Sequence, residues 1–241
     1  MPGHGRFPRD LRGEWMDDPS LPVEAHRRAL RGLARLNACS RSGAPIWRAM
    51  EPGVREADGR ASVLDVASGS GDVLIDVARR ARRSGVDLDL CAADISPVAS
   101  RALEERSARS GIPVRTVTTD VVAGELPGRF DIVMCSLFLH HLSMDDIVRL
   151  LRKMAGAARK MVVISDLVRS RVALAMALGA SRVLTRSRVV HVDAVRSVRA
   201  ALTPRELADA ARAARLEGFS IRKAFAVRMV LTWQPPAAGL T

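Results

Sequence analysis

The stretch Val63-Leu64-Asp65-Val66-Ala67-Ser68-Gly69-Ser70-Gly71-Asp72 decides how the rest of this chain is interpreted. Its first half belongs to the apolar run Ala61 to Val66, which is typical of a buried strand. Small residues follow, and apolar residues then recur at helical spacing from Val73 to Ala81. The order strand, glycine turn, helix predicts the opening unit of a nucleotide-binding α/β sheet, in which glycines let a ligand approach the backbone.

The same stretch departs from two common phosphate-binding loops. A dinucleotide fingerprint requires Gly or Ala at the sixth position from Gly69, where this chain has Leu74. A P-loop requires Lys after its second glycine, where this chain has Asp72. The carboxylates of Asp65 and Asp72 would repel a phosphate, so they favour a cationic or zwitterionic ligand.

This stretch resembles the first motif of class I S-adenosylmethionine-dependent methyltransferases. The form with Ala67 before Ser-Gly-Ser-Gly-Asp is similar to the ubiquinone/menaquinone C-methyltransferase group and its small-molecule relatives. The resemblance covers about residues 61–233. It implies an α/β fold with a Rossmann-like, seven-stranded, mostly parallel sheet, helices on both faces and an antiparallel last strand. It also implies S-adenosyl-L-methionine as cofactor, S-adenosyl-L-homocysteine as product, and cofactor contacts at Asp65, Ala67, Ser68, Gly69 and Gly71.

The ends of the later strands supply the rest of the predicted cofactor site. Asp94 directly follows a predicted strand over residues 87–93. Its separation along the sequence from the glycine turn is close to that at which an acidic residue binds a ribose diol. The alternative for Asp94 is that it caps the following helix. The resemblance further implies that Asp120 accepts from the adenine amino group and that Val121 covers the ring. The remaining predicted cofactor residues are Ile95, Cys135 and Ser136.

The catalytic candidates are histidines. His140 and His141 lie in the segment LFLHHL, which follows the predicted fourth strand and resembles the corresponding segment of the family. In that fold, the end of this strand faces the transferable methyl group. A neutral imidazole can take a proton from a phenol or enol, and adjacent histidines point in different directions, so at most one is expected to act. The alternative is a capping or packing role. No third ligand has suitable spacing, so no metal site is predicted.

The chain divides into four predicted parts: an N-terminal helical cap over residues 1–60, a cofactor-binding core over 61–166, an insertion over 167–202, and the C-terminal part of the core over 203–241. In the cap, the resemblance allows Arg35 or Asn37 to reach the methionyl end of the cofactor. The insertion contains the apolar run Val172 to Ala180 and is interpreted as a helical lid over the acceptor pocket. A helix lying on a membrane surface and a contact with a second subunit are its alternatives.

The insertion also supplies a third histidine candidate. Related small-molecule methyltransferases have an Asp-containing turn at this place, followed by a Ser-x-Arg run. His191 and Asp193 would lie in that turn, with Ser197 and Arg199 after it. His191 is therefore a candidate catalytic residue of the acceptor pocket.

Composition indicates the expected location and partners of the protein. The net charge of +12 comes mostly from arginine and is attributed to coding bias, with attraction to anionic partners as the alternative. Three widely spaced cysteines argue against disulfide or zinc frameworks. No apolar run approaches the ~20 residues of a membrane span, and the N-terminus has no signal-peptide pattern. A cytoplasmic protein follows, with a homodimer as an option.

The predicted function is methyl transfer from S-adenosyl-L-methionine to oxygen or carbon of a small aromatic, phenolic, polyketide or quinol-like acceptor in secondary metabolism. The alternatives are an RNA methyltransferase and a non-catalytic cofactor-binding protein of the same fold. Nucleic acid is not the expected partner, because Cys135-Ser136-Leu137-Phe138 lacks the Asn/Asp-Pro-Pro-aromatic motif of amino-methylating nucleic-acid enzymes.

Overall fold

A computed structural model describes residues 7–18, 20–55, 60–224 and 227–236. Its seven-stranded sheet has the order β3-β2-β1-β4-β5-β7-β6. The first five strands run parallel, and β7 is antiparallel to both of its neighbours. The predicted fold class is therefore confirmed. The strands are β1 (Arg60–Val66), β2 (Asp87–Asp94), β3 (Arg115–Thr118), β4 (Phe130–Ser136), β5 (Ala158–Leu167), β6 (Ser220–Ala224) and β7 (Arg228–Trp233).

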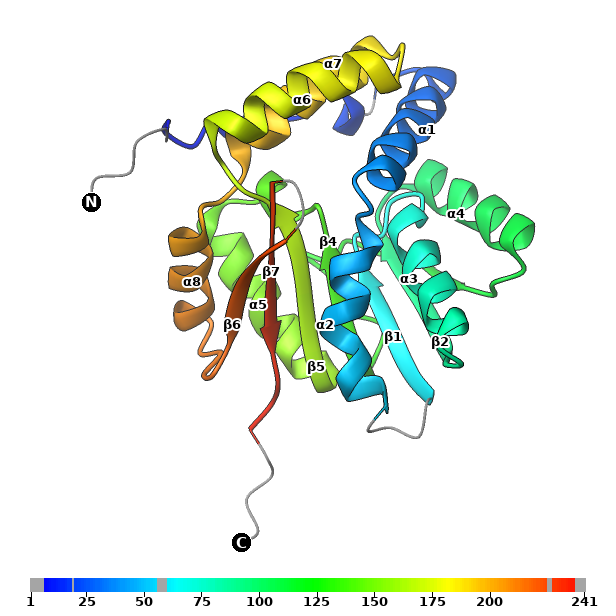
Figure 1. The fold of residues 1–241 in the computed structure, drawn as a ribbon, viewed down its shortest axis with the longest axis vertical. Helices are drawn as coiled ribbons and strands as arrows, with labels where there is room; N and C mark the ends of the chain where they lie inside the picture. Colours follow the sequence, from blue (N-terminus) through cyan, green and yellow to red (C-terminus); the bar gives the residue numbers. More distant parts are fainter. Residues whose placement is uncertain (1–6, 19, 56–59, 225–226, 237–241) are drawn as a thin grey trace, which may run out of the picture.

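The helices cover both faces of this sheet and one of its edges (Figure 1). They are α1 (Val23–Cys39), α2 (Gly43–Arg55), α3 (Asp72–Arg83), α4 (Pro97–Ser110), α5 (Met144–Ala157), α6 (Arg171–Leu184), α7 (Arg188–Ala200) and α8 (Pro204–Ala213), with 3-10 turns η1 (Trp15–Asp17) and η2 (Leu139–His141). Helix α2 extends to Arg55, and Val54 in its last turn is fully buried in the core. Helix α8 begins with a capping box, in which Thr203 and Glu206 are bonded reciprocally.

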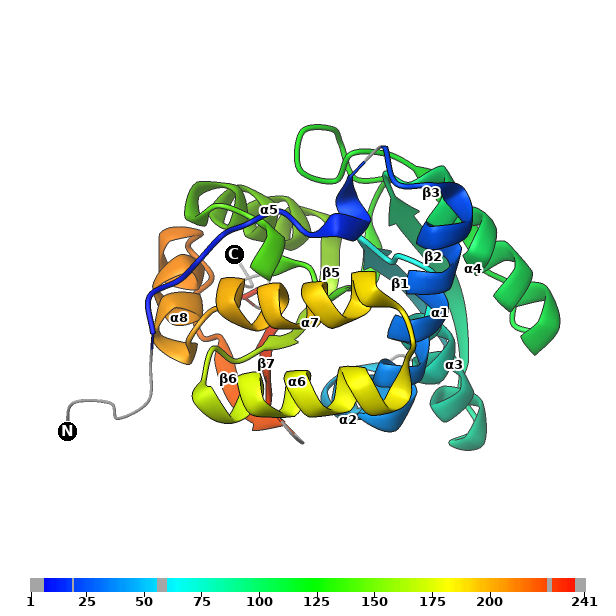
Figure 2. The same cartoon turned by 90° about the horizontal axis from the view of Figure 1, so that it is seen from above.

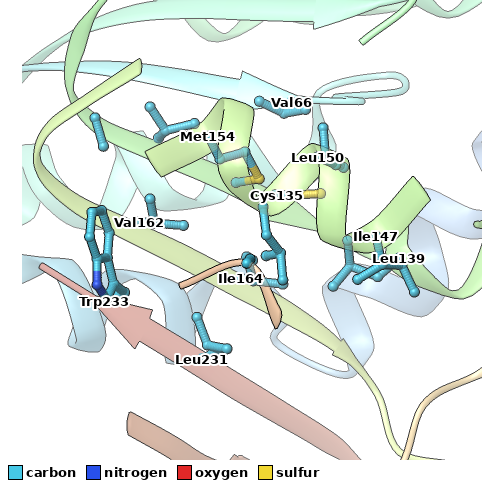
Figure 3. Packing of buried hydrophobic residues seen from close by; sticks show 14 of the residues in the cluster. Val66, Cys135, Leu139, Ile147, Leu150, Met154, Val162, Ile164, Leu231 and Trp233 are labelled. Carbon is cyan, nitrogen blue, oxygen red and sulfur yellow. The ribbon is translucent and has the colours of Figure 1, made fainter. Parts of the chain in front are cut away.

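Two hydrophobic clusters lie on opposite faces of the sheet, as alternating strand residues require. In β1, Leu64 and Val66 join the cluster under α5 and α8, whereas Val63 joins the cluster under α2 and α3. Figure 3 shows the first cluster, where Cys135 packs among Leu150, Met154 and their neighbours. This alternation determines which side chains at the strand ends face the same side.

The carboxyl ends of the parallel strands are covered by two further layers. Helices α6 and α7 lie side by side across this edge, above β5 and β7 (Figure 1). Residues 7–18, here called the N-terminal strap, run alongside α7 before the chain enters α1 (Figure 2). Within the described residues, no helix is both long and apolar enough to cross a membrane.

The structure corrects one expectation for the insertion. The resemblance places residues 191–193 in an Asp-containing turn, but they lie inside α7. The physical reason is the apolar spacing: Val190 and Val198 lie eight residues apart and are both buried on one helical face. Ser197 and Arg199, the Ser-x-Arg run, also lie in α7.

Candidate active site

The turn between β1 and α3 has the strained backbone that its small residues predict. Ala67, Gly69 and Gly71 all have positive φ, at 56°, 53° and 66°. A Cβ at Gly71 would lie 2.6 Å from Cγ of Leu103, so the turn packs closely against α4. A Cβ at Gly69 would meet nothing within 4 Å, so this side of the turn is open to a ligand.

Asp94 ties this turn to the end of β2. Its carboxylate accepts hydrogen bonds from the N–H of Gly69 at 2.7 Å and of Ser96 at 2.8 Å. The residue that caps α4 is Ser96, whose hydroxyl accepts from the N–H of Ala99. The capping role considered for Asp94 therefore belongs to Ser96, and Asp94 lies beside the glycine turn where a ribose-binding carboxylate was predicted.

The other predicted cofactor residues lie after β2, after β3 and at the end of β4. Asp120 is exposed, and the N–H groups of Ala123 and Val122 lower the pKa of its carboxyl by donating to it. Val121 is buried against the core, whereas Ile95 is 64% exposed. Cys135 has its side chain inside the core, where burial raises the pKa of the thiol well above its usual value. Cys135 can therefore offer only its backbone to a ligand.

Four buried polar atoms gather at the carboxyl edge without a hydrogen-bond partner among the described residues. They are Oδ1 of Asp65, Oγ of Ser136, Oγ of Ser165 and Nη1 of Arg228. Each lies an even number of residues along its strand from a member of the α2–α3 cluster, so all four point to the same face of the sheet. Buried polar groups are rarely left unpaired, so this face is suited to a polar ligand.

The two charged members of this set have opposite signs. Burial, with the charges of Asp72 and Asp94, raises the pKa of Asp65 well above its usual value. Burial lowers the pKa of Arg228 to about 10, against the attraction of Asp166 and Asp72. Asn37 connects this region, because its amide donates to Asp72 at 2.9 Å and accepts from Arg228 at 3.1 Å. Asn37 and Arg35 are the two cap residues predicted to reach the methionyl end of the cofactor. Asn37 lies in this region, whereas Arg35 is exposed.

A second polar centre lies at the ends of β4 and β5. His140 is only 4% exposed, and its Nδ1 lies 2.8 Å from Oδ1 of Asp166. The backbone N–H of His140 donates to the other carboxylate oxygen at 3.3 Å. Burial alone would lower the pKa of His140, but the carboxylates of Asp166 and Glu14 outweigh it and raise this pKa to about 10. The ring therefore carries charge that balances these two carboxylates.

Glu14 reaches this centre from the N-terminal strap. Its Oε1 lies 3.6 Å from Nε2 of His140 and 3.9 Å from Nε2 of His141. Burial would raise the pKa of Glu14, but the hydrogen bond and charges of the two histidines lower it. Sequence reasoning missed Glu14, because it lies in a stretch without periodicity and meets the histidines only in the folded chain.

The remaining histidine candidates lie in different settings. His141 is partly exposed, with its ring 4.4 Å from that of His140 and stacked on Phe138. His191 lies on α7, where its Nε2 is 2.8 Å from the carbonyl oxygen of Thr185. Asp193 of the same helix is buried and accepts the N–H groups of Trp15 and Met16, so it holds the strap that carries Glu14.

Comparisons with known proteins agree with this geometry. Residues 63–161 match a family model described as a methyltransferase domain. No protein of curated function matches the chain in sequence. Solved structures resemble the chain over more of its length than the family model does. Every sequence identity given below is under 25%, so these likenesses show the fold alone.

Among solved structures of similar fold is the plantazolicin methyltransferase BamL, bound to a desmethylplantazolicin analogue and SAH, with 13% identity, a TM-score of 0.62, and coverage of 88% of this chain and 96% of that one. The magnesium protoporphyrin IX methyltransferase of Synechocystis PCC 6803, with bound SAH, has 16% identity, a TM-score of 0.54 and coverage of 91% and 90%. An O-methyltransferase family 2 protein of Planctomyces limnophilus, bound to apigenin, has 15% identity, a TM-score of 0.55 and coverage of 73% and 51%. The chain spans about half the length of this last protein and of two other methyltransferases of similar structure.

Proposed function

We propose that the protein transfers a methyl group from S-adenosyl-L-methionine to a small acceptor, because residues 63–161 match the methyltransferase-domain model and the sheet has the topology of the class I S-adenosylmethionine-dependent fold. One observation carries the proposal. The glycine turn and Asp94 lie at the ends of β1 and β2, while the His140–Asp166 pair lies at the ends of the neighbouring β4 and β5. A donor site and a proton-accepting site thus share one edge of the sheet, where ligands of open α/β sheets bind.

The residues at this edge fit the cofactor. Asp94 would accept from the ribose hydroxyls, and Asp120 from the adenine amino group, with Val121 beside the ring. The methionyl end is a zwitterion, and the unpaired Oδ1 of Asp65 and Nη1 of Arg228 place an acidic and a basic group on the same face. Burial and the like charges of Asp72 and Asp94 disfavour the ionised form of Asp65, and an ammonium beside it would favour that form. The remaining predicted contacts are Ala67, Ser68, Gly69, Gly71, Ile95, Cys135 and Ser136, which stay predictions.

When bound, the cofactor supplies a methyl group already activated on a sulfonium, for in-line displacement by oxygen or carbon. The chain therefore mainly has to bind and align two reactants, which can supply about 7–11 kcal/mol of the barrier. The acceptor would lose its proton to Glu14 or His141, which the charged ring of His140 adjoins. A positioned acid–base group of this kind contributes roughly 10²–10⁴-fold. Asp166 would orient His140 through the 2.8 Å contact at Nδ1.

The proposed acceptor is a phenolic, polyketide or quinol-like compound of secondary metabolism. Its support is the half-buried Phe138, whose ring stacks on His141 and offers an apolar face beside the cluster. Helices α6 and α7 cover this edge, and the structurally similar proteins include one bound to the flavone apigenin. His191 lies on α7 and is proposed to contribute to the acceptor side of the site.

The test is methyl transfer from labelled S-adenosyl-L-methionine to a panel of phenols, quinols and aromatic polyketides, with RNA as the comparison substrate. The proposal predicts label on at least one small aromatic acceptor and none on RNA. Label on RNA, in a reaction that weakens with salt, would overturn the acceptor class in favour of an RNA methyltransferase. Tight cofactor binding with no turnover on any acceptor would favour a non-catalytic protein of this fold.

A further inference from the structure

Three metal-ligating atoms converge on one partly buried point near the ends of β4 and β5. They are Nε2 of His140, Nε2 of His141 and a carboxylate oxygen of Glu14, all within 4.8 Å of one another. We propose that a first-row transition-metal dication, with zinc the best suited, binds between Glu14, His140 and His141. Two imidazoles and one carboxylate are the ligand set of a catalytic zinc site that keeps an open fourth position.

The spacing of these atoms is close to that of a bound ion. Oε1 of Glu14 lies 3.6 Å from one imidazole nitrogen and 3.9 Å from the other. Ligand atoms around a tetrahedral zinc with bonds of about 2.0–2.1 Å lie about 3.3 Å apart. Each of these two pairs therefore has to close by only a few tenths of an ångström, which side-chain rotation can supply.

The second nitrogen of His140 is already held in the way that metal-binding histidines require. Nδ1 of His140 lies 2.8 Å from Oδ1 of Asp166, and Asp166 is itself fixed by the N–H groups of His140 and Leu167. A carboxylate on one imidazole nitrogen sets the ring orientation and increases the basicity of the other, which then binds the ion. Asp166 would thus position the ligand without touching the metal.

Charge balance also favours a dication. Glu14 and Asp166 place two carboxylates in a site where their side chains are 9% and 2% exposed. Buried charges are costly unless they are paired or coordinate a metal. A dication that replaces the proton of His140 would neutralise both carboxylates and leave both imidazoles neutral, and neutral imidazole is the form that binds metals.

The strap holds Glu14 from both sides, so this ligand is built into the fold. The N–H groups of Trp15 and Met16 donate to Asp193, and Arg196 donates to the carbonyl of Gly13. The hydroxyl of Ser197 donates to Glu14 itself. The same strap is anchored to the other end of α7, where Nε of Arg9 donates to the carbonyl of Ala200 at 2.6 Å.

A bound ion would offer its open position to an oxygen of the acceptor and make that oxygen more acidic. This role rests on the proposed function, whereas metal binding does not, because the protein's own side chains supply every ligand. The metal is therefore to be tested on the protein alone, without cofactor or acceptor.

The experiment titrates Co²⁺ into full-length protein that carries no polyhistidine tag and has been treated with a chelator. We expect one equivalent to bind with the visible absorption of a four-coordinate site, and Zn²⁺ to displace it. Mg²⁺ prefers oxygen ligands and should not compete. Glu14→Gln and His141→Asn should each weaken binding at least tenfold, while His26→Asn and Glu51→Gln should leave it unchanged.

Circular dichroism of each variant separates a lost ligand from a lost fold, and the partly exposed His141 provides the milder of the two ligand changes. Absence of Co²⁺ and Zn²⁺ binding by the folded wild type would overturn the proposal, as would undiminished binding in both ligand variants. Methyl transfer is measured separately. Transfer that proceeds unchanged in metal-free protein would refute a role of the metal in the reaction, while leaving metal binding and the proposed function intact. Metal binding without transfer to any acceptor would support the metal site and count against the proposed function.

Discussion

The two ends of the candidate site are built in different ways. The cofactor end depends on one continuous stretch, Val63 to Asp72, and on Asp94, which follows it in the next strand and bonds to the N–H of Gly69. The acceptor end brings together Glu14, His140 and Asp166, which come from the strap, from η2 and from the end of β5. The first end is held by backbone geometry and the second by charged side chains packed far from water.

This difference predicts how substitutions at the two ends should act. A site made from backbone turns tolerates side-chain changes except where a Cβ would clash, as at Gly71. A site made from buried charges depends on every member, because the loss of one leaves its partners uncompensated. Changes at the acceptor end should therefore affect turnover most, whereas changes at the cofactor end should affect binding or stability.

The largest effect is expected for Asp166→Asn. The amide keeps the size of the side chain but removes the charge that positions His140. We expect kcat to fall about 10²–10³-fold, while the affinity for S-adenosylhomocysteine changes by less than about threefold. Steady-state kinetics and calorimetry measure the two quantities.

The matched control is Asp145→Asn, an exposed carboxylate in the first turn of α5, which should change neither quantity. A fall in cofactor affinity as large as the fall in turnover would show that the two ends do not act separately. Unchanged turnover in Asp166→Asn would remove Asp166 from the proposed mechanism.

A smaller effect is expected for Gly71→Ala. The new Cβ would lie 2.6 Å from Leu103, and a left-handed backbone adds strain to any residue other than glycine. We expect the free energy of unfolding to fall by about 3 kcal/mol, from roughly 1–2 of strain and 1–3 of overpacking.

Gly111→Ala separates these two terms. Gly111 has φ of 62°, but a Cβ added there would meet nothing within 4 Å, so only the strain should appear, at about 1–2 kcal/mol. Urea unfolding of both variants gives the difference. Equal losses at the two positions would contradict close packing of the glycine turn against Leu103.

The smallest effect concerns the pH dependence of stability at Asp193, which holds the strap. Burial raises the pKa of Asp193 to about 6 from a usual value of 3.8, with Glu14 adding to the shift and the backbone donors and Arg196 opposing it. The folded protein thus holds this proton more tightly than the unfolded chain. Its contribution is fully present below about pH 4 and is lost as the pH rises through about 6.

Wild type and Asp193→Asn are to be compared by urea unfolding between pH 4 and pH 7. The stability of the wild type relative to the variant should fall by about 2 kcal/mol across this range. Asp120→Asn is a control in which the opposite pH dependence is expected. The pKa of Asp120 is lowered, so its contribution to stability is lost as the pH falls. A wild-type advantage at Asp193 that grows with pH would refute this account of the strap.

The sequence predicts the local structure of the proposed cofactor end, because that structure is encoded in one continuous stretch and the next strand end. The glycine turn, Asp94 and the strand ends follow from periodicity and from small residues at fixed spacing. The clearest error concerns residues 191–193, where resemblance suggests a turn and the spacing of Val190 and Val198 produces helix α7.

The acceptor end could be predicted only in part. His140 and His141 stand out as titratable residues after a strand, but their relation to Glu14 depends on how the strap crosses α7. No local pattern in residues 7–18 carries that information. For the same reason, spacing along the sequence indicates no third ligand near the histidines, whereas the fold brings Glu14 beside them. Arg228 likewise resembles an ordinary strand residue until burial leaves its Nη1 unpaired.

The central claim is that the ends of β1 and β2 bind the cofactor, separately from the acceptor end. Calorimetric titration with S-adenosylhomocysteine of the wild type, Asp94→Ala and Asp166→Asn tests it most directly. The account predicts micromolar binding by the wild type, at least about tenfold weaker binding by Asp94→Ala, and nearly unchanged binding by Asp166→Asn. Absence of binding by folded wild type, or full affinity in Asp94→Ala, would contradict it.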